Sequence, residues 1–172
     1  FVLSSGLHSP QYVQCAKLLS LPKASNKFTL SLSKKIKKHI KNIDIILSPA
    51  MGGIIIGYEI GRLLNKETIF SERVNEEFIL RRNFSIKPNQ KILIMEDVIT
   101  TGKSSLECSK LVLDKGAKIA GYACIIDRSN SKSLIKNKII SQIQLNIPTY
   151  EEKDLPENLS AIEAIKPGSR NL

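Results

Sequence analysis

The segment that most constrains the fold is an apolar run that leads through two adjacent acids into a turn and then a helical pattern. Residues 92–95 are apolar, Glu96 and Asp97 follow, and the turn at 100–102 carries two threonines and a glycine. Helical spacing of leucines then predicts a helix over 104–115. A strand that passes into a helix over so few residues favours a parallel βαβ unit.

The same alternation extends along the chain. Apolar runs predict further strands, and apolar spacing predicts a further helix over 53–64. The polar residues 74–77 predict a hairpin-like turn. We expect an α/β fold with a mainly parallel sheet, helices on both faces, and a single domain over residues 1–172. The predicted strands are 44–47, 68–71, 91–95 and 119–126.

Composition indicates the cellular compartment of the protein. Its apolar stretches are interrupted by polar residues and fall short of the roughly 20 residues that a membrane span needs, and the first residues lack a secretory pattern. The three cysteines are widely spaced and form no metal or redox pair. We therefore expect a cytoplasmic protein with reduced thiols. Because no initiating Met is present, we also expect the amino terminus to be incomplete.

The formal charge of +10 indicates an acidic partner. Nucleic acid, anionic lipid and a small polyphosphate all remain possible on charge alone. Many of the lysines fall within residues 34–41, where apolar residues at 32, 36, 40 and 43 recur with helical spacing. We interpret these lysines as the solvated face of a helix.

Ligands of parallel sheets bind at the carboxyl ends of the strands. That rule selects residues 49–53, 96–104 and 127–128. At 100–104, backbone N–H groups at a helix start, a glycine and several hydroxyls make a phosphate cradle beside two carboxylates. A nucleotide-triphosphatase loop is excluded, because Asp97 occupies the position of its first glycine.

The segment 92–104 resembles the signature of the type I phosphoribosyltransferases. Other segments resemble the orotate phosphoribosyltransferase family in its shorter bacterial subtype, so that the resemblance runs nearly from end to end. These segments are residues 1–12, 49–54, 70–73, 80–84 and 166–170.

This resemblance implies a type I phosphoribosyltransferase fold with a small hood formed from the terminal segments. It implies transfer of ribose 5-phosphate from phosphoribosyl pyrophosphate to orotate, which gives orotidine 5′-monophosphate and pyrophosphate in pyrimidine synthesis. Mg²⁺ would arrive bound to the sugar diphosphate, without direct protein ligands. The expected assembly is a homodimer, with no nucleic-acid or membrane partner.

The resemblance also assigns roles to individual residues. Glu96 and Asp97 would hold the ribose hydroxyls, and Arg73 would reach the pyrophosphate across a dimer interface; these three are the expected catalytic residues. Thr100 and Arg128 would contact orotate, and Ser4 to Gly6 would close over it. The phosphoribosyl pyrophosphate site would also include Val98, Ile99, Thr100, Thr101, Gly102, Lys103 and Ser104, and the pyrophosphate loop would be Met51, Gly52 and Gly53.

Two positions depart from the family pattern. The loop after Arg73 lacks the lysines and histidine that many relatives carry, and Arg81 or Arg82 either supplies that charge or faces solvent from a strand. Lys103 replaces a small residue, and either strengthens the phosphate grip or points to solvent. Two other functions remain as rivals: a purine phosphoribosyltransferase, and a nucleic-acid-binding regulator built on the same domain.

Overall fold

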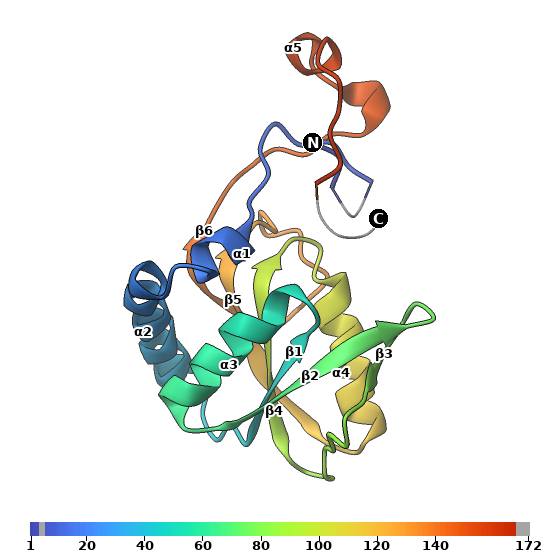
Figure 1. The fold of residues 1–172 in the computed structure, drawn as a ribbon. Coiled ribbons are helices and arrows are strands. Elements are labelled where there is room, and N and C mark those ends of the chain that lie inside the picture. Colours follow the sequence, from blue (N-terminus) through green and yellow to red (C-terminus); the bar gives the residue numbers. More distant parts are fainter. Residues whose placement is uncertain (4–5, 168–172) are drawn as a thin grey trace. The chain divides into compact units, whose positions relative to one another are not determined.

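The computed structural model describes residues 1–3 and 6–167 (Figure 1). The chain divides into two compact units. The main unit comprises residues 15–145, and the terminal unit combines residues 1–14 with the segment from residue 146 onward. Within the described residues, no helix is both long enough and apolar enough to cross a membrane.

The main unit is built on a six-stranded sheet with the order β3-β2-β1-β4-β5-β6. Strand β3 pairs antiparallel with β2, and every other neighbouring pair is parallel. The expected α/β class with a mainly parallel sheet is therefore confirmed. The strands are β1 Ile45–Pro49, β2 Glu67–Val74, β3 Glu77–Leu80, β4 Lys91–Ile99, β5 Lys118–Asp127 and β6 Ile139–Gln144.

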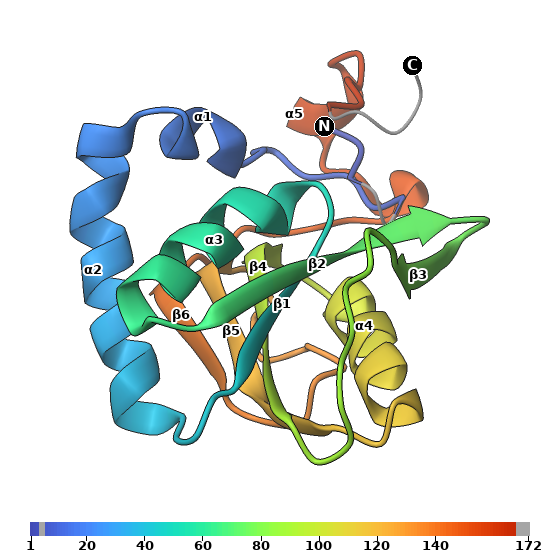
Figure 2. The ribbon, with the colours of Figure 1, turned by 60° about the horizontal axis from the view of Figure 1, so that its bottom comes forward.

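Helices cover both faces of this sheet (Figures 1 and 2). Ser48 of β1 lies beneath Gly57 of α3, whereas its neighbour Leu47 belongs to the apolar cluster that contains Cys108 of α4. Because successive strand residues point to opposite faces, α3 and α4 pack on opposite sides. The helices of the main unit are α1 Cys15–Leu19, α2 Pro22–His39, α3 Gly52–Leu64 and α4 Lys103–Asp114.

The connections place a topological switch between β1 and β4. The chain leaves β1 through α3 toward β2, and leaves β4 through α4 toward β5 on the other side of the sheet. The two helices therefore begin on either side of the adjacent carboxyl ends of β1 and β4. Open α/β sheets bind their ligands at such a point.

Several element boundaries differ from the sequence prediction. Strand β4 continues to Ile99, so that the acidic pair lies within the strand and not after it. Helix α2 ends at His39; Ile40 and Ile43 are buried as expected but lie outside the helix. Strand β6 was not predicted, because its polar residues at 141, 142 and 144 dilute the apolar run.

The terminal unit brings the two ends of the chain together. His8 bridges to both Val2 and Tyr150, and the Val2 N–H donates to the Ile165 carbonyl at 2.8 Å. A 3-10 helix, η1 Glu152–Asp154, and a short helix, α5 Glu157–Ser160, follow. Ser4, Ser5 and residues 168–170, which contribute to the family resemblance, lie outside the described residues.

Candidate active site

The carboxylate of Asp97 faces the backbone of Gly52. A Cβ atom on Gly52 would lie 2.7 Å from Asp97 Oδ2, closer than non-bonded atoms approach. Gly52 begins α3, and the preceding Met51 is 77% exposed and joined to Ala50 by a cis peptide bond. The loop predicted to hold pyrophosphate therefore meets one of the predicted ribose acids directly, although the two are 45 positions apart in the sequence.

The two acids of β4 point in opposite directions, as adjacent strand residues do. Asp97 points toward α3. Glu96 lies near Cys108 of α4, where burial and, to a lesser extent, the charge of Glu96 raise the pKa of the thiol. Glu96 is buried, and Asp97 is half-buried. The acidic pair therefore offers carboxylates to both sides of the switch point.

Burial controls the protonation of Asp97. It raises the pKa of the carboxyl group, and a hydrogen bond donated by the Val98 N–H to Asp97 Oδ1, at 2.8 Å, lowers the pKa in part. Cys15 of α1 lies nearby: burial, and secondarily the charge of Asp97, raise the pKa of its thiol to about 12. The thiol therefore stays protonated beside the carboxylate at neutral pH.

The loop between β4 and α4 presents its polar residues to solvent. Thr100, Thr101 and Lys103 are exposed, whereas Gly102 is buried with a φ of 80°. The left-handed conformation favours glycine, and a Cβ at this position would also lie 2.8 Å from Ile135 Cγ1. The Leu134 N–H donates to the Thr101 carbonyl at 2.9 Å. The segment 133–135 thus packs against the buried side of the loop.

The start of α4 suits an anion. The Lys103 N–H donates to Thr101 Oγ1 at 3.3 Å, and Ser104 in the first turn is half-buried. The positive end of a helix dipole and its N–H groups favour phosphate. Val98 is half-buried and Ile99 is buried, and their expected contacts with the sugar diphosphate stay a prediction.

Arg128 lies immediately after β5, beside the end of β4. Its N–H donates to the Ile99 carbonyl at 2.8 Å, and Ile99 is in register with Asp127. The residue is only 8% exposed, and burial lowers the pKa of its guanidinium. A cation held so deep beside Thr100 is placed to meet an anionic ligand at the sheet edge.

Arg73 lies near the tip of the β2–β3 hairpin, which extends past the sheet (Figure 2). Its guanidinium forms an ion pair with Glu107 of α4, donates to the Glu76 carbonyl, and lies 4.2 Å from the centre of the Phe78 ring. Sequence reasoning missed Glu107. The available signal was its position three residues after Ser104, on the same side of α4.

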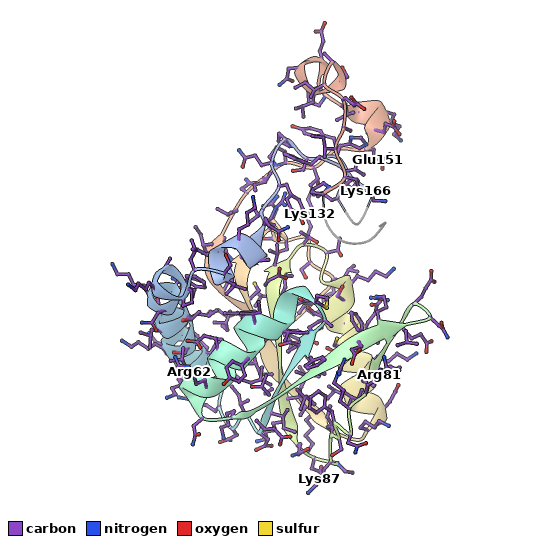
Figure 3. The ribbon with its side chains drawn as sticks, viewed as in Figure 1. Arg62, Arg81, Lys87, Lys132, Glu151 and Lys166 are labelled. Carbon is purple, nitrogen blue, oxygen red and sulfur yellow. The ribbon has the colours of Figure 1, made fainter. Side chains whose placement is uncertain are left out.

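Arg81 and Arg82 face solvent, as one of the two sequence interpretations expected, but they are not strand residues. They follow β3, and both pair with Glu72 of β2; the Arg82 Nε to Glu72 Oε1 distance is 2.8 Å. Their side chains remain more than half exposed. Figure 3 labels Arg81 beside the hairpin.

The structure thus gathers most of the predicted residues at the carboxyl ends of neighbouring strands. Gly52 follows β1, the acids lie near the end of β4, the loop 100–104 begins α4, and Arg128 follows β5. Arg73 lies on the β2–β3 hairpin and is paired with Glu107 of α4. This arrangement can bind a polyhydroxylated, phosphorylated ligand between two helix starts.

Comparison with known proteins defines the class of protein to which the chain belongs. The family model of the phosphoribosyl transferase domain matches residues 23–153. Among solved structures, orotate phosphoribosyltransferase from Aeropyrum pernix superposes with a TM-score of 0.70 at 19% identity, covering 84% of this chain and 85% of that one. Adenine phosphoribosyltransferase from Thermoanaerobacter pseudethanolicus gives 0.67 at 18% identity over 78% of this chain and 88% of that one. At such low identity, these two similarities concern the fold alone.

Sequence relatives narrow the class. Orotate phosphoribosyltransferase of Parvibaculum lavamentivorans is 42% identical, covering 100% of this chain and 89% of that protein. The protein of the same name from Rhizorhabdus wittichii is 44% identical over 99% of this chain and 87% of its own length. The chain belongs to the orotate phosphoribosyltransferase family, within the phosphoribosyl transferase domain class.

Proposed function

We propose that this chain transfers ribose 5-phosphate from phosphoribosyl pyrophosphate to orotate, forming orotidine 5′-monophosphate and pyrophosphate. The observation that carries the proposal is the contact of Asp97 with Gly52, beside the phosphate cradle at 100–104. The proposed pyrophosphate loop, ribose acid and phosphate loop would then follow one another as pyrophosphate, ribose and 5-phosphate do in the sugar diphosphate.

Binding of the sugar would use both carboxylates of β4. Asp97 and Glu96 accept hydrogen bonds from ribose hydroxyls, and bonds to charged acceptors are stronger than neutral ones. The 5-phosphate is received by the N–H groups and hydroxyls at Thr100, Thr101, Gly102 and Ser104. Lys103 is exposed at the same helix start, where its ammonium adds attraction for the phosphate.

Departure of pyrophosphate leaves positive charge on the sugar. Nearby carboxylates stabilise that charge, while the amides of Met51, Gly52 and Gly53, together with Arg73, stabilise the leaving anion. Orotate is received by Arg128 and Thr100. Its acidic ring nitrogen, which has lost its proton to solvent, bonds to the anomeric carbon as the C–O bond to pyrophosphate breaks. Positioning the two substrates is the main requirement, and no covalent nucleophile is needed. Among the thiols, Cys15 and Cys108 have pKa values raised to about 12.

Mg²⁺ fits this site as an ion carried by the sugar diphosphate. The diphosphate oxygens would supply most of the ligands of the ion. The carboxylates of Asp97 and Glu96 would act on the ion through the ribose hydroxyls that they hold, and not as direct ligands. When bound, the ion neutralises charge on the leaving group.

A cytoplasmic homodimer completes the proposal. All three cysteines are free and buried, in keeping with a reducing compartment. Met51, which precedes α3, and Ile55 and Tyr58 of the helix are 77%, 53% and 65% exposed. These residues, spaced by four and three positions, form one stripe along the helix, and an apolar stripe of this kind suits contact with a second copy.

The decisive experiment follows orotate absorbance with phosphoribosyl pyrophosphate and Mg²⁺, using the native chain, the Asp97→Asn variant and a panel of purine bases. We expect loss of orotate alone, strongly slowed in the variant. Turnover of a purine instead would replace the proposal with the purine enzyme. Salt-dependent nucleic-acid binding without any turnover would favour the regulator.

Light scattering tests the assembly separately. We expect the mass of a dimer for the native chain and of a monomer for Tyr58→Glu, with Lys110→Glu on α4 as an exposed control away from the stripe. A native monomer would remove the homodimer from the proposal.

A further inference from the structure

Arg73 is fixed by contacts that come from two different elements. The carbonyl of Glu76 and the ring of Phe78 belong to its own hairpin, whereas Glu107 belongs to α4. Arg73 and Glu107 are both about one-third exposed. The ion pair is thus accessible enough to open, and enough water is excluded for the attraction to exceed that of a fully solvated pair.

A second contact runs parallel to this ion pair. Ser71 Oγ lies 3.2 Å from Cys108 Sγ, and both residues are buried. Ser71 and Arg73 lie on the same face of β2, and Cys108 directly follows Glu107. The hairpin is therefore fastened to α4 by a buried polar contact and, closer to solvent, by an ion pair.

Glu107 also connects to the phosphate cradle through the helix. It follows Ser104 by three residues and Lys103 by four, so the three side chains share one flank of α4. A carboxylate one turn beyond a phosphate site opposes anion binding by its charge, unless a cation neutralises it. Arg73 supplies that cation in the structure.

We propose that Glu107 is a positioning residue that holds Arg73 against α4 between turnovers and competes with pyrophosphate for its guanidinium. This inference rests on the proposed role of Arg73 in binding pyrophosphate. Pyrophosphate, with its higher charge, takes the guanidinium from Glu107 during the reaction, and Glu107 recovers it as the product leaves. Glu107 would thus favour product release at the expense of substrate affinity.

The test is the Glu107→Gln variant, which keeps the shape of the side chain and removes its charge. We expect the KM for phosphoribosyl pyrophosphate and the inhibition constant of pyrophosphate each to fall about three- to tenfold, with a lower kcat because product leaves more slowly. The KM for orotate should not change. Glu107→Asp should restore much of the native behaviour, and Glu77→Gln, on the same hairpin, controls for the loss of one negative charge.

A double-mutant cycle separates this inference from the function on which it rests. If Glu107 acts on pyrophosphate through Arg73, Glu107→Gln should leave the inhibition constant of pyrophosphate unchanged when Arg73 is already alanine. Equal effects in both backgrounds, or a native pyrophosphate inhibition constant in Glu107→Gln, would overturn the role of Glu107. An Arg73→Ala variant with native affinity for both diphosphates would instead overturn the role proposed for Arg73.

Discussion

Asp97 lies directly over the backbone of Gly52, with 2.7 Å between its Oδ2 atom and the position that a Cβ on Gly52 would occupy. The carboxylate is held from the other side by the N–H of its neighbour Val98. This close approach joins the start of α3 to the acidic strand. Because Gly52 has no side chain, the predicted pyrophosphate loop can lie this close to the predicted ribose acid.

Substitution of Gly52 by alanine should therefore reduce activity without unfolding the protein. The new methyl group displaces the Asp97 carboxylate, and a misplacement of about 1 Å can lower kcat/KM on the order of 10²-fold. Alanine favours the helix over glycine, so the melting temperature should stay the same or rise. Steady-state kinetics would measure kcat/KM, and thermal unfolding would measure the melting temperature.

The matched control is Gly57→Ala in the same helix. Its Cβ would lie 2.0 Å from the buried Ser48 Oγ, so we expect destabilisation of about 1–3 kcal/mol, with kcat/KM nearly native in the folded fraction. If Gly52→Ala lowered stability and activity together, as a packing defect does, the assigned role of Gly52 would be wrong.

Asp97→Asn should weaken catalysis and stabilise the fold at neutral pH. Loss of hydrogen bonds to a charged acceptor is worth about 1.5–3 kcal/mol, so kcat/KM for the sugar diphosphate should fall roughly 10- to 150-fold. Burial raises the pKa of Asp97, which means that the folded state disfavours the charged form. The stability gain of the variant should be present at neutral pH and should disappear as the pH falls below the ordinary range of an aspartate.

The raised pKa of Asp97 also predicts the acidic limb of the pH profile. The native kcat/KM for the sugar diphosphate should decline, as the pH is lowered, at a higher pH than an exposed aspartate would produce, because the ribose contact needs the carboxylate. The Asn variant should lack this part of the decline. A limb unchanged by the substitution would assign the titration to another group.

Arg128→Lys should raise the KM for orotate without changing the KM for the sugar diphosphate. One ammonium cannot reproduce the two-pronged donation of a guanidinium, so the KM for orotate should rise tenfold or more. Arg62→Lys serves as the control, because Arg62 is exposed and pairs with Glu59 at 2.7 Å. Parallel increases in both KM values for Arg128→Lys would indicate a structural defect and not loss of a base contact.

The three thiols should not react with a disulfide reagent in the native protein. Cys15, Cys108 and Cys124 are all buried, and burial raises the pKa of each, so a disulfide reagent at pH 8 should titrate none of them within minutes. All three should react in denaturant. Rapid reaction of one thiol under native conditions would reveal local opening of the element that carries it.

Much of the site could be predicted from one stretch of sequence. Residues 92–104 contain the strand, both acids, the glycine turn and the helix start in consecutive order, and these features depend on local backbone preferences and apolar periodicity. The alternation of strands and helices could also be predicted from the sequence, and the structure confirmed the mainly parallel sheet that it indicated. Boundaries were less certain: β4 runs on to Ile99 because pairing with β5, and not composition, determines where a strand ends.

Tertiary structure alone decided which distant residues meet. Strand order brings Gly52 beside Asp97, and the crossover through α4 brings Glu107 to Arg73, 34 positions away in the sequence. The strand period determined that Glu96 and Asp97 point to opposite faces, but only the packed helices determined what each face meets. The sequence by itself therefore determined the chemical groups and their local geometry, whereas the partner of each group depends on long-range packing that no local pattern encodes.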